Sequence, residues 1–173
     1  GFCIEATIDL PAQGAPGAHG FSTEDMPRDF NKFNSEASIR LSNSFISKVK
    51  KLRSRYSQLP QCKEKPFVIA IASFDRPFAH FAAARPILAT LYGLYHDEEA
   101  TIESGSKSII SYNVEAAVKK ENVNIAMGLF CTPDYSDVSA VIYSSLATWG
   151  KVRALADNPS RSEERRVGKE CRS

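Results

Sequence analysis

Residues 66–74 read PFVIAIASF, an almost uninterrupted apolar run of strand length with charged residues before and after it. A run of this kind is typical of a strand in the middle of an α/β sheet, where both faces of the strand are buried. The sequence therefore predicts a central strand at residues 66–74 that is covered on both sides.

The N-terminal side predicts a strand and a helix that lead into this central strand. Residues 2–10 alternate as in a β-strand, with one face made of Phe2, Ile4, Ala6 and Ile8 and the other of Cys3, Glu5, Thr7 and Asp9. In residues 44–59 an apolar residue recurs every three or four positions, which predicts an amphipathic helix that stops before Pro60. Its other faces are basic, and a basic helix face is most often solvated surface. Residues 11–20 predict a loop, and residues 21–38 show no regular pattern.

The C-terminal side predicts further strands and helices. Helices are expected within residues 78–94, beginning at Pro86, and over residues 146–156. Strands are expected at residues 108–113, 123–130 and 138–144, and a polar loop at residues 96–107. The order of these elements predicts an α/β fold, with a mixed α+β arrangement as the alternative. We expect a three-layer arrangement in which helices flank a central sheet.

The composition is that of an ordinary globular protein. The chain has 173 residues, of which 43% are hydrophobic and 24% charged, so wholesale disorder is excluded and one domain is expected. The longest stretch without a charged residue, 10–23, has only 14 residues and is rich in Gly, Pro and Ala. It is too short and too polar for a membrane span. We expect a cytoplasmic protein.

Residues 161–173 read RSEERRVGKECRS and show no periodicity that could join a core. They can be back-translated into a DNA string that resembles a short-read sequencing adapter. We therefore expect a non-native tail at residues 161–173, and one domain at residues 1–160 that is truncated at both ends. The tail holds five basic and three acidic residues, which leaves 17 of each in the remainder. The net charge of +2 therefore gives no support to nucleic-acid binding.

The reactive side chains form no familiar motif. Outside the tail, Cys3, Cys62 and Cys131 are widely spaced without a CxxC pair, which predicts reduced, mostly buried thiols rather than a disulfide framework or a zinc site. The three histidines are isolated in the sequence. The glycine-rich phosphate loops, the GxSxG motif and the HExxH motif are absent.

Six blocks in order carry a first family resemblance: IEAT (4–7), RSRYSQLP (53–60), KPFVIAIASF (65–74), LYG (91–93), GLF (128–130) and VSAVIYS (138–144), the last followed by Thr148 and Lys151. The chain resembles, over roughly residues 2–155, a family of uncharacterised bacterial proteins with the signature IEA, Y-x-x-LP, KPFVxAI, LYG and VSAVLFS. This resemblance implies a bacterial origin, and the family has no established activity.

A second resemblance rests on the order of a Glu5-Ala6-Thr7 strand, a basic helix and a buried strand. This order is similar to PD-(D/E)xK nucleases, which have the restriction-endonuclease-like fold. The resemblance implies Mg²⁺-dependent cleavage of nucleic-acid phosphodiesters, in which carboxylates hold the ion and a lysine favours the attacking hydroxide. Glu5 would then be a metal ligand, and Thr7 stands where the pattern has its lysine. We expect Lys48 of the helix to replace that lysine, and a further carboxylate upstream of Gly1.

Other candidate residues have equally simple structural interpretations. Asp75 and Arg76 directly follow the buried strand, where ligands of α/β sheets gather, but they could also form only an ion pair in a turn. Thr148 and Lys151 are one turn apart on the expected last helix and could reach an anionic group or simply lie on the surface. Glu5 itself could be no more than a solvated or ion-paired strand residue.

Two functions therefore remain open. One is a nuclease-like enzyme with Mg²⁺ as cofactor and nucleic acid as partner. The other is a non-catalytic α/β binding module, a degenerate relative of the nuclease fold. Hydrolysis of a small substrate through Asp75 is disfavoured, because the sequence shows no pairing of a nucleophile with a base.

Overall fold

The computed structural model describes residues 1–9, 22–105, 107–119 and 123–146. In chain order its strands and α-helices are β1 (Cys3–Asp9), α1 (Phe30–Ser54), β2 (Phe67–Ser73), α2 (Arg85–Tyr92), β3 (Leu94–His96), α3 (Glu98–Ser104), β4 (Ser111–Asn113), β5 (Ala116–Lys119), β6 (Val123–Ala126) and β7 (Ala140–Ser144). Short 3-10 turns connect several of them, at Thr23–Asp25, Tyr56–Gln58, Ala79–Ala82, Leu129–Cys131 and Pro133–Tyr135.

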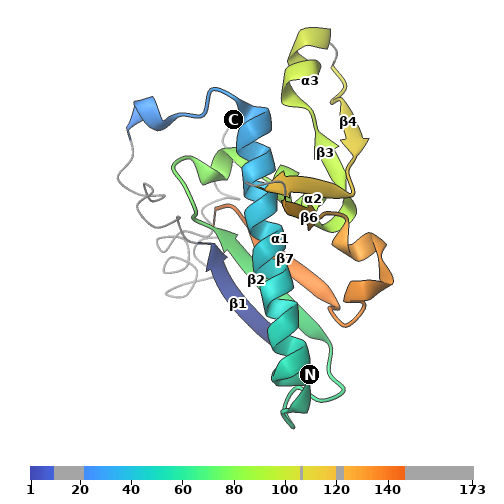
Figure 1. Cartoon of the computed structure of the whole chain (residues 1–173). Helices are drawn as coiled ribbons and strands as arrows, with labels where there is room; N and C mark the ends of the chain where they lie inside the picture. Colours follow the sequence, from blue (N-terminus) through green and yellow to red (C-terminus); the bar gives the residue numbers. More distant parts are fainter. Residues whose placement is uncertain (10–21, 106, 120–122, 147–173) are drawn as a thin grey trace, which may run out of the picture.

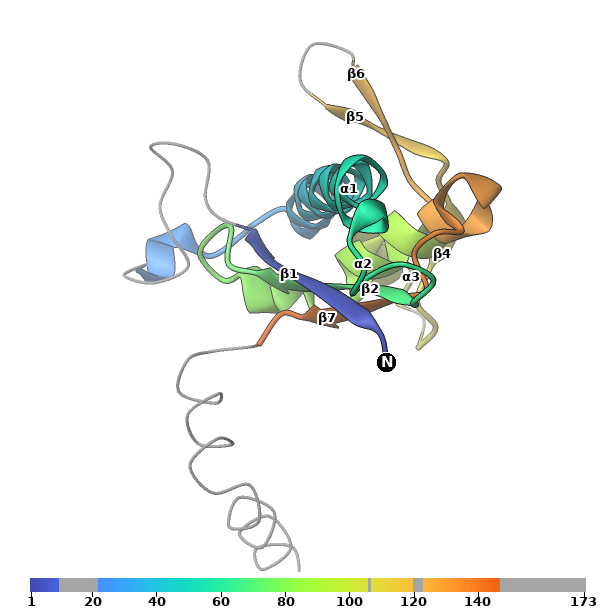
Figure 2. The same ribbon diagram turned by 90° about the horizontal axis from the view of Figure 1, so that it is seen from below.

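A parallel sheet of order β1-β2-β7 forms the centre of the molecule, and α1 lies across one of its faces (Figures 1 and 2). The apolar run of residues 66–74 forms β2, the middle strand. This strand pairs with β1 from Cys3↔Phe67 to Asp9↔Ser73 and with β7 from Val68↔Ala140 to Ala72↔Ser144. The predicted α/β fold class and the central position of this strand are confirmed.

The main core fills the space between α1 and the sheet. Leu41, Phe45 and Val49 of α1 are almost completely buried, as are Ile69 and Ile71 of β2. Burying an aliphatic or aromatic side chain of this size is worth roughly 1.5–3 kcal/mol. This contact therefore fixes α1 against β1 and β2, and with it the polar side chains that the same surfaces carry.

The opposite face of the sheet is apolar and open in the part of the chain that the structure describes. Ile4, Ile8 and Ile142 there are 51%, 56% and 54% exposed, and Val68 and Ala70 of β2 are half-buried. The prediction was that β2 is covered on both sides. Among the described residues, only the face that packs against α1 is covered. The helix expected at residues 146–156 falls almost entirely outside them, and so does the tail at residues 161–173.

Helix α1 begins 14 residues earlier than the apolar spacing predicts, at Phe30 instead of residue 44. The expectation of irregular structure over residues 21–38 is wrong for its second half, residues 30–38. Asp29 is the N-cap and accepts a hydrogen bond from the Lys32 N–H, 2.7 Å away. The apolar spacing does not reveal the first half of the helix, because small polar residues occupy its buried face. Ser38, for example, donates its hydroxyl to the Asn34 carbonyl and is buried as an apolar residue would be.

The region after β2 agrees with the sequence in part. The helix expected at Pro86 is α2, and the strand expected within residues 108–113 is β4, which pairs antiparallel with β3. The loop expected at residues 96–107 contains α3 instead, which Asp97 caps by accepting from the Ala100 N–H. The strand expected at residues 123–130 is present as the shorter β6. It pairs antiparallel with β5, a strand that the sequence does not predict.

Among the described residues, no helix combines the length and the apolar composition that crossing a membrane requires.

Candidate functional site

The polar face of β1 points toward α1. Along β1 the side chains of Cys3, Glu5, Thr7 and Asp9 are half-buried or buried, whereas those between them are exposed. An alternation of this kind places all four on the inner side of the sheet. The inner side of β1 therefore opposes a row of α1 residues with hydrogen-bonding groups rather than an apolar stripe.

The structure brings Glu5 and Lys48 together. The Lys48 Nζ lies 2.8 Å from the Glu5 Oε1, and the side chains are 14% and 22% exposed. The two residues come from positions 43 apart in the sequence and meet because α1 crosses β1. This carboxylate–ammonium pair is partly shielded from water, which strengthens its attraction relative to a surface pair.

A second polar contact lies further along the same two elements. Ser44, one turn before Lys48 on α1, donates its hydroxyl to the Asp9 Oδ1 at the end of β1. Glu5 and Asp9 are four residues apart on an extended strand, about 13 Å. Their carboxylates therefore take part in separate contacts, with Thr7 half-buried between them.

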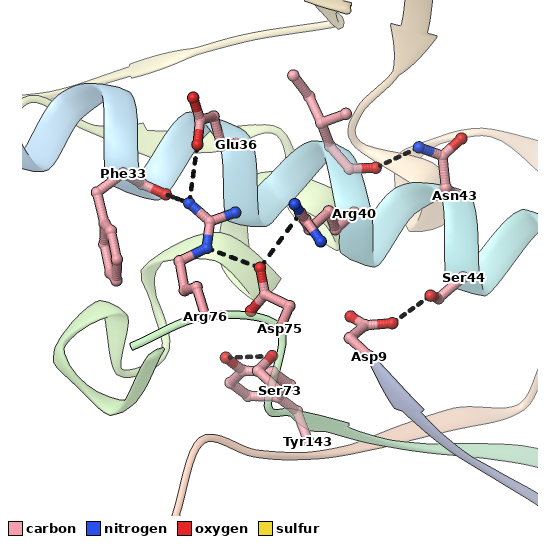
Figure 3. A network of polar contacts seen from close by, with 11 residues as sticks. Asp9, Phe33, Glu36, Arg40, Asn43, Ser44, Ser73, Asp75, Arg76 and Tyr143 are labelled. Atoms are coloured by element: carbon pink, nitrogen blue, oxygen red, sulfur yellow. Dashed lines mark hydrogen bonds and ion pairs between the residues drawn. The ribbon is translucent and has the colours of Figure 1, made fainter. Parts of the chain in front are cut away.

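Asp75 is the centre of a larger cluster, shown in Figure 3. Its Oδ2 lies 2.7 Å from the Arg76 Nε and 3.3 Å from the Arg40 Nε, and the Asp75 side chain is only 3% exposed. Arg76 also forms an ion pair with Glu36, whose Oε2 is 3.0 Å from the Arg76 Nη1. We call this cluster, together with its neighbours at the carboxyl ends of β1, β2 and β7, the strand-end network: Asp9, Glu36, Arg40, Ser44, Ser73, Asp75, Arg76 and Tyr143.

The β2 and β7 strands contribute hydroxyl groups to the strand-end network. The Ser73 Oγ lies 3.3 Å from the Tyr143 Oη, below Asp75 in Figure 3. Burial raises the pKa of the Tyr143 hydroxyl, and the nearby carboxylates of Asp75 and Asp9 act in the same direction. The hydroxyl of Tyr143 therefore stays protonated and available as a hydrogen-bond donor.

Among the carboxyl groups of the strand-end network, Asp9 has a pKa that clearly departs from that of an exposed aspartate. Burial raises the pKa of the Asp9 carboxyl, the Ser44 hydrogen bond opposes this, and the negative charge of Asp75 raises it again. The positive charge of Arg40 lowers it by a smaller amount. Asp9 therefore holds a proton more readily than an exposed aspartate does.

The charges of the strand-end network largely compensate one another. Arg40 and Arg76 face the carboxylates of Asp75 and Glu36, and the Arg76 Nη2 is buried and has no hydrogen-bond partner among the described residues. No group of three or more His, Cys, Asp or Glu residues that could hold a metal ion occurs among the described residues. The arrangement can thus hold α1 against the ends of the strands, and among the described residues it leaves the Nη2 amino group of Arg76 without a partner.

No family model, curated protein or solved structure matches this chain. The chemistry of the site must therefore be inferred from its own residues.

The candidates from the sequence divide into three groups. Glu5 and Lys48 are in contact, with Thr7 beside them on the inner face of β1. Asp75 and Arg76 form the ion pair that the sequence offered as their simpler interpretation, inside the strand-end network. Thr148 and Lys151 lie outside the described residues.

Sequence reasoning named Lys48 but missed the rest of the polar row of α1 to which it belongs. Arg40, Ser44 and Lys48 recur every four residues and lie beside the apolar stripe of Leu41, Phe45 and Val49. A four-residue spacing places side chains on one face of a helix, so this second row could have been found in the sequence. Its partner Asp9 could have been found too, since it ends a predicted strand whose carboxyl end is a common ligand position.

A separate cavity of about 190 Å³ opens between α1, α2 and the small antiparallel strands. Small side chains and two tyrosines line it, including Ser35, Ser38, Tyr95, Tyr112 and Met127. None of the described residues singled out in the sequence contributes to this cavity.

Proposed function

We propose that this chain is a nuclease-like domain that hydrolyses nucleic-acid phosphodiesters with Mg²⁺, Glu5 being a metal ligand and Lys48 the basic residue beside it. The observation that carries the proposal is the 2.8 Å contact between Lys48 and Glu5 on a β1-α1-β2 unit with parallel strands. The same unit underlies the resemblance to PD-(D/E)xK nucleases, whose lysine position is occupied by Thr7 here.

The residues beside Glu5 suit an oxygen-ligated ion. Glu5 offers a carboxylate and Thr7 a hydroxyl from the same face of β1, and Lys48 contacts Glu5 through its Oε1 atom. Magnesium in proteins is commonly held by one or two carboxylates, together with waters and substrate phosphates. When bound, it would lower the pKa of a water molecule and stabilise charge on the phosphate.

Lys48 would have two roles in this chemistry. Its ammonium orients the Glu5 carboxylate, and its positive charge favours a hydroxide near the scissile phosphate. Because the Lys48 side chain is 14% exposed, it can contact a ligand without leaving Glu5. A lysine at this place can therefore supply from the helix the charge that Thr7 cannot supply from the strand.

The basic surface of α1 supports nucleic acid as the partner. Lys50, Lys51 and Arg55 are exposed near the C-terminal end of α1, whereas Arg53 is engaged by Asp137 through two hydrogen bonds. Phosphate contacts by such residues are independent of sequence and weaken with salt. We therefore expect low sequence specificity and strong salt dependence of binding.

Cleavage of DNA and RNA with Mg²⁺ and with EDTA tests the proposal. We expect cleavage with Mg²⁺ only, and a loss of about 100-fold or more in Lys48→Met. Lys32→Met is the matched control, because Lys32 is an exposed lysine in the first turn of the same helix, and it should keep nearly the parent rate. Equal rates for Lys48→Met and Lys32→Met, with both variants folded, would rule out the role of Lys48.

A non-catalytic binding module is the second candidate, and the strand-end network favours it. The Asp75 carboxylate there is compensated by Arg40 and Arg76, so its charge is engaged in holding α1 to the ends of the strands. Fluorescence anisotropy of labelled nucleic acid distinguishes the two candidates. Binding that is unchanged by EDTA, with no cleavage under any divalent ion, would favour the module.

A further inference from the structure

Two thiols that are far apart in the sequence are in contact. Cys3 begins β1, Cys62 lies in the loop between α1 and β2, and their Sγ atoms are 2.9 Å apart across 59 residues. Both are free cysteines with half-buried side chains, and Cys131 is exposed. The expectation of mostly buried thiols is thus wrong for these three cysteines, and Cys3 contacts Cys62 because β1 and the loop meet at one end of the sheet.

The backbone on both sides of the thiol pair is fixed by hydrogen bonds. The Cys3 N–H donates to the Pro66 carbonyl at 2.9 Å, which is the first bond of the β1–β2 pairing. The Cys62 N–H donates to the Leu59 carbonyl at 2.9 Å, in the turn that follows α1. Because both cysteines are held in place, their sulfurs can join with little backbone movement, which a disulfide requires.

We propose that Cys3 and Cys62 form a reversible disulfide with each other. They would do so by thiol–disulfide exchange with small-molecule disulfides such as oxidised glutathione. One protein thiolate attacks a sulfur of the glutathione disulfide, which breaks its S–S bond and releases one reduced glutathione. The second protein thiolate then attacks the mixed disulfide, forms the Cys3–Cys62 bond and releases a second glutathione. The two protein sulfurs lose two electrons in total, the glutathione disulfide gains them, and both thiol protons leave with the released glutathione.

The disulfide would connect the start of β1 to the loop before β2 and enclose the whole of α1. Closing a loop of about 60 residues reduces the entropy of the unfolded chain, so the oxidised form should unfold at a temperature higher by roughly 5–10 °C. It would also restrain the strand that carries Glu5, two residues beyond Cys3. The inference does not depend on the proposed function, because it concerns only the contact between the thiols.

Equilibration of the folded chain in buffers of graded reduced and oxidised glutathione tests the inference. Mass spectrometry of the intact chain should show the loss of two hydrogens, and peptide mapping should show a Cys3–Cys62 link that reduced glutathione removes. In Cys62→Ser the internal link cannot form, so Cys3 should instead retain one glutathione. Cys131→Ser is the control, since Cys131 is exposed and its removal should leave the Cys3–Cys62 link unchanged.

Separate glutathione adducts on Cys3 and Cys62 of the folded chain, with no link between them at any glutathione ratio, would overturn the inference. A variant that fails to fold leaves the parent measurement intact, because the peptide map of the parent chain identifies the linked cysteines directly.

Discussion

At the scale of single residues, burial decides which polar contacts matter for stability. Asp75 is 3% exposed and contacts two arginines, whereas Asp137 is 33% exposed and its partner Arg53 is 51% exposed. A buried carboxylate that is removed leaves uncompensated charges behind, but an exposed one is replaced by water. The two aspartates therefore form a matched pair for comparison.

We expect Asp75→Asn to lower the free energy of unfolding by roughly 3–5 kcal/mol, because Arg40 and Arg76 lose their shared carboxylate. Asp137→Asn should cost at most about 1 kcal/mol. Urea denaturation of both variants measures the difference. Equal costs for the two substitutions would contradict the structural role given to Asp75.

The raised pKa of Asp9 predicts that the stability of the folded chain depends on pH. Its pKa is raised in the folded chain, chiefly by burial, so the folded state keeps this proton to a higher pH than the unfolded state. The contribution of Asp9 to stability is therefore fully present below the unfolded value near pH 4 and is lost as the pH rises through the folded pKa.

Asp9→Asn should remove this loss, because an asparagine cannot ionise and still accepts a hydrogen bond from Ser44. The free energy of unfolding of Asp9→Asn, relative to the parent, should then increase between pH 3.5 and pH 7. Urea titrations at the two pH values provide the measurement. A relative stability that stays constant or falls with pH would show that Asp9 ionises normally in the folded chain.

At the scale of elements, the junction between α2 and β3 depends on a glycine. Gly93 has a φ of +67°, and an added Cβ would lie 2.7 Å from the Val114 carbonyl oxygen. Gly105 ends α3 with a φ of +58°, but nothing lies within 4 Å of an added Cβ there. The two glycines have a similar conformation, and only Gly93 is packed against another segment.

Gly93→Ala should therefore destabilise the chain by roughly 2–4 kcal/mol, from the left-handed backbone and the clash together. Gly105→Ala should cost only about 1–2 kcal/mol, from the backbone conformation alone. Thermal unfolding of the two variants separates these contributions. If Gly105→Ala proved the more damaging, the packing of Gly93 against Val114 would be in question.

The elements also show which parts of the fold the sequence could predict. The position of β2 was predictable, because an almost fully apolar strand flanked by charged residues is typical of the middle of a parallel sheet. The first half of α1 was not, because Asn34, Ser38 and Ser42 are buried on a helix face where the pattern requires apolar residues. Their side chains are small, and the hydroxyls of Ser38 and Ser42 find carbonyl partners, at Asn34 and Ala126, that no sequence pattern shows.

At the scale of the whole molecule, the site arises from the crossing of α1 over the sheet. Glu5 and Lys48 were both named from the sequence, because a motif pointed to one and the edge of the apolar stripe to the other. Their contact, and the joining of Asp9 and Asp75 to α1 through Ser44 and Arg40, depends on the angle and register of that crossing. Those are tertiary properties that local periodicity does not encode.

The initial rate of Mg²⁺-dependent nucleic-acid cleavage by Glu5→Gln, beside the parent chain, tests the proposed function most directly. Glu115→Gln is the control, because Glu115 is an exposed glutamate remote from α1 in the sequence. We predict that Glu5→Gln loses about 100-fold or more of the parent rate while Glu115→Gln keeps it. Cleavage by a folded Glu5→Gln at the parent rate, or no cleavage by the parent chain, would contradict the assignment of Glu5 as a metal ligand.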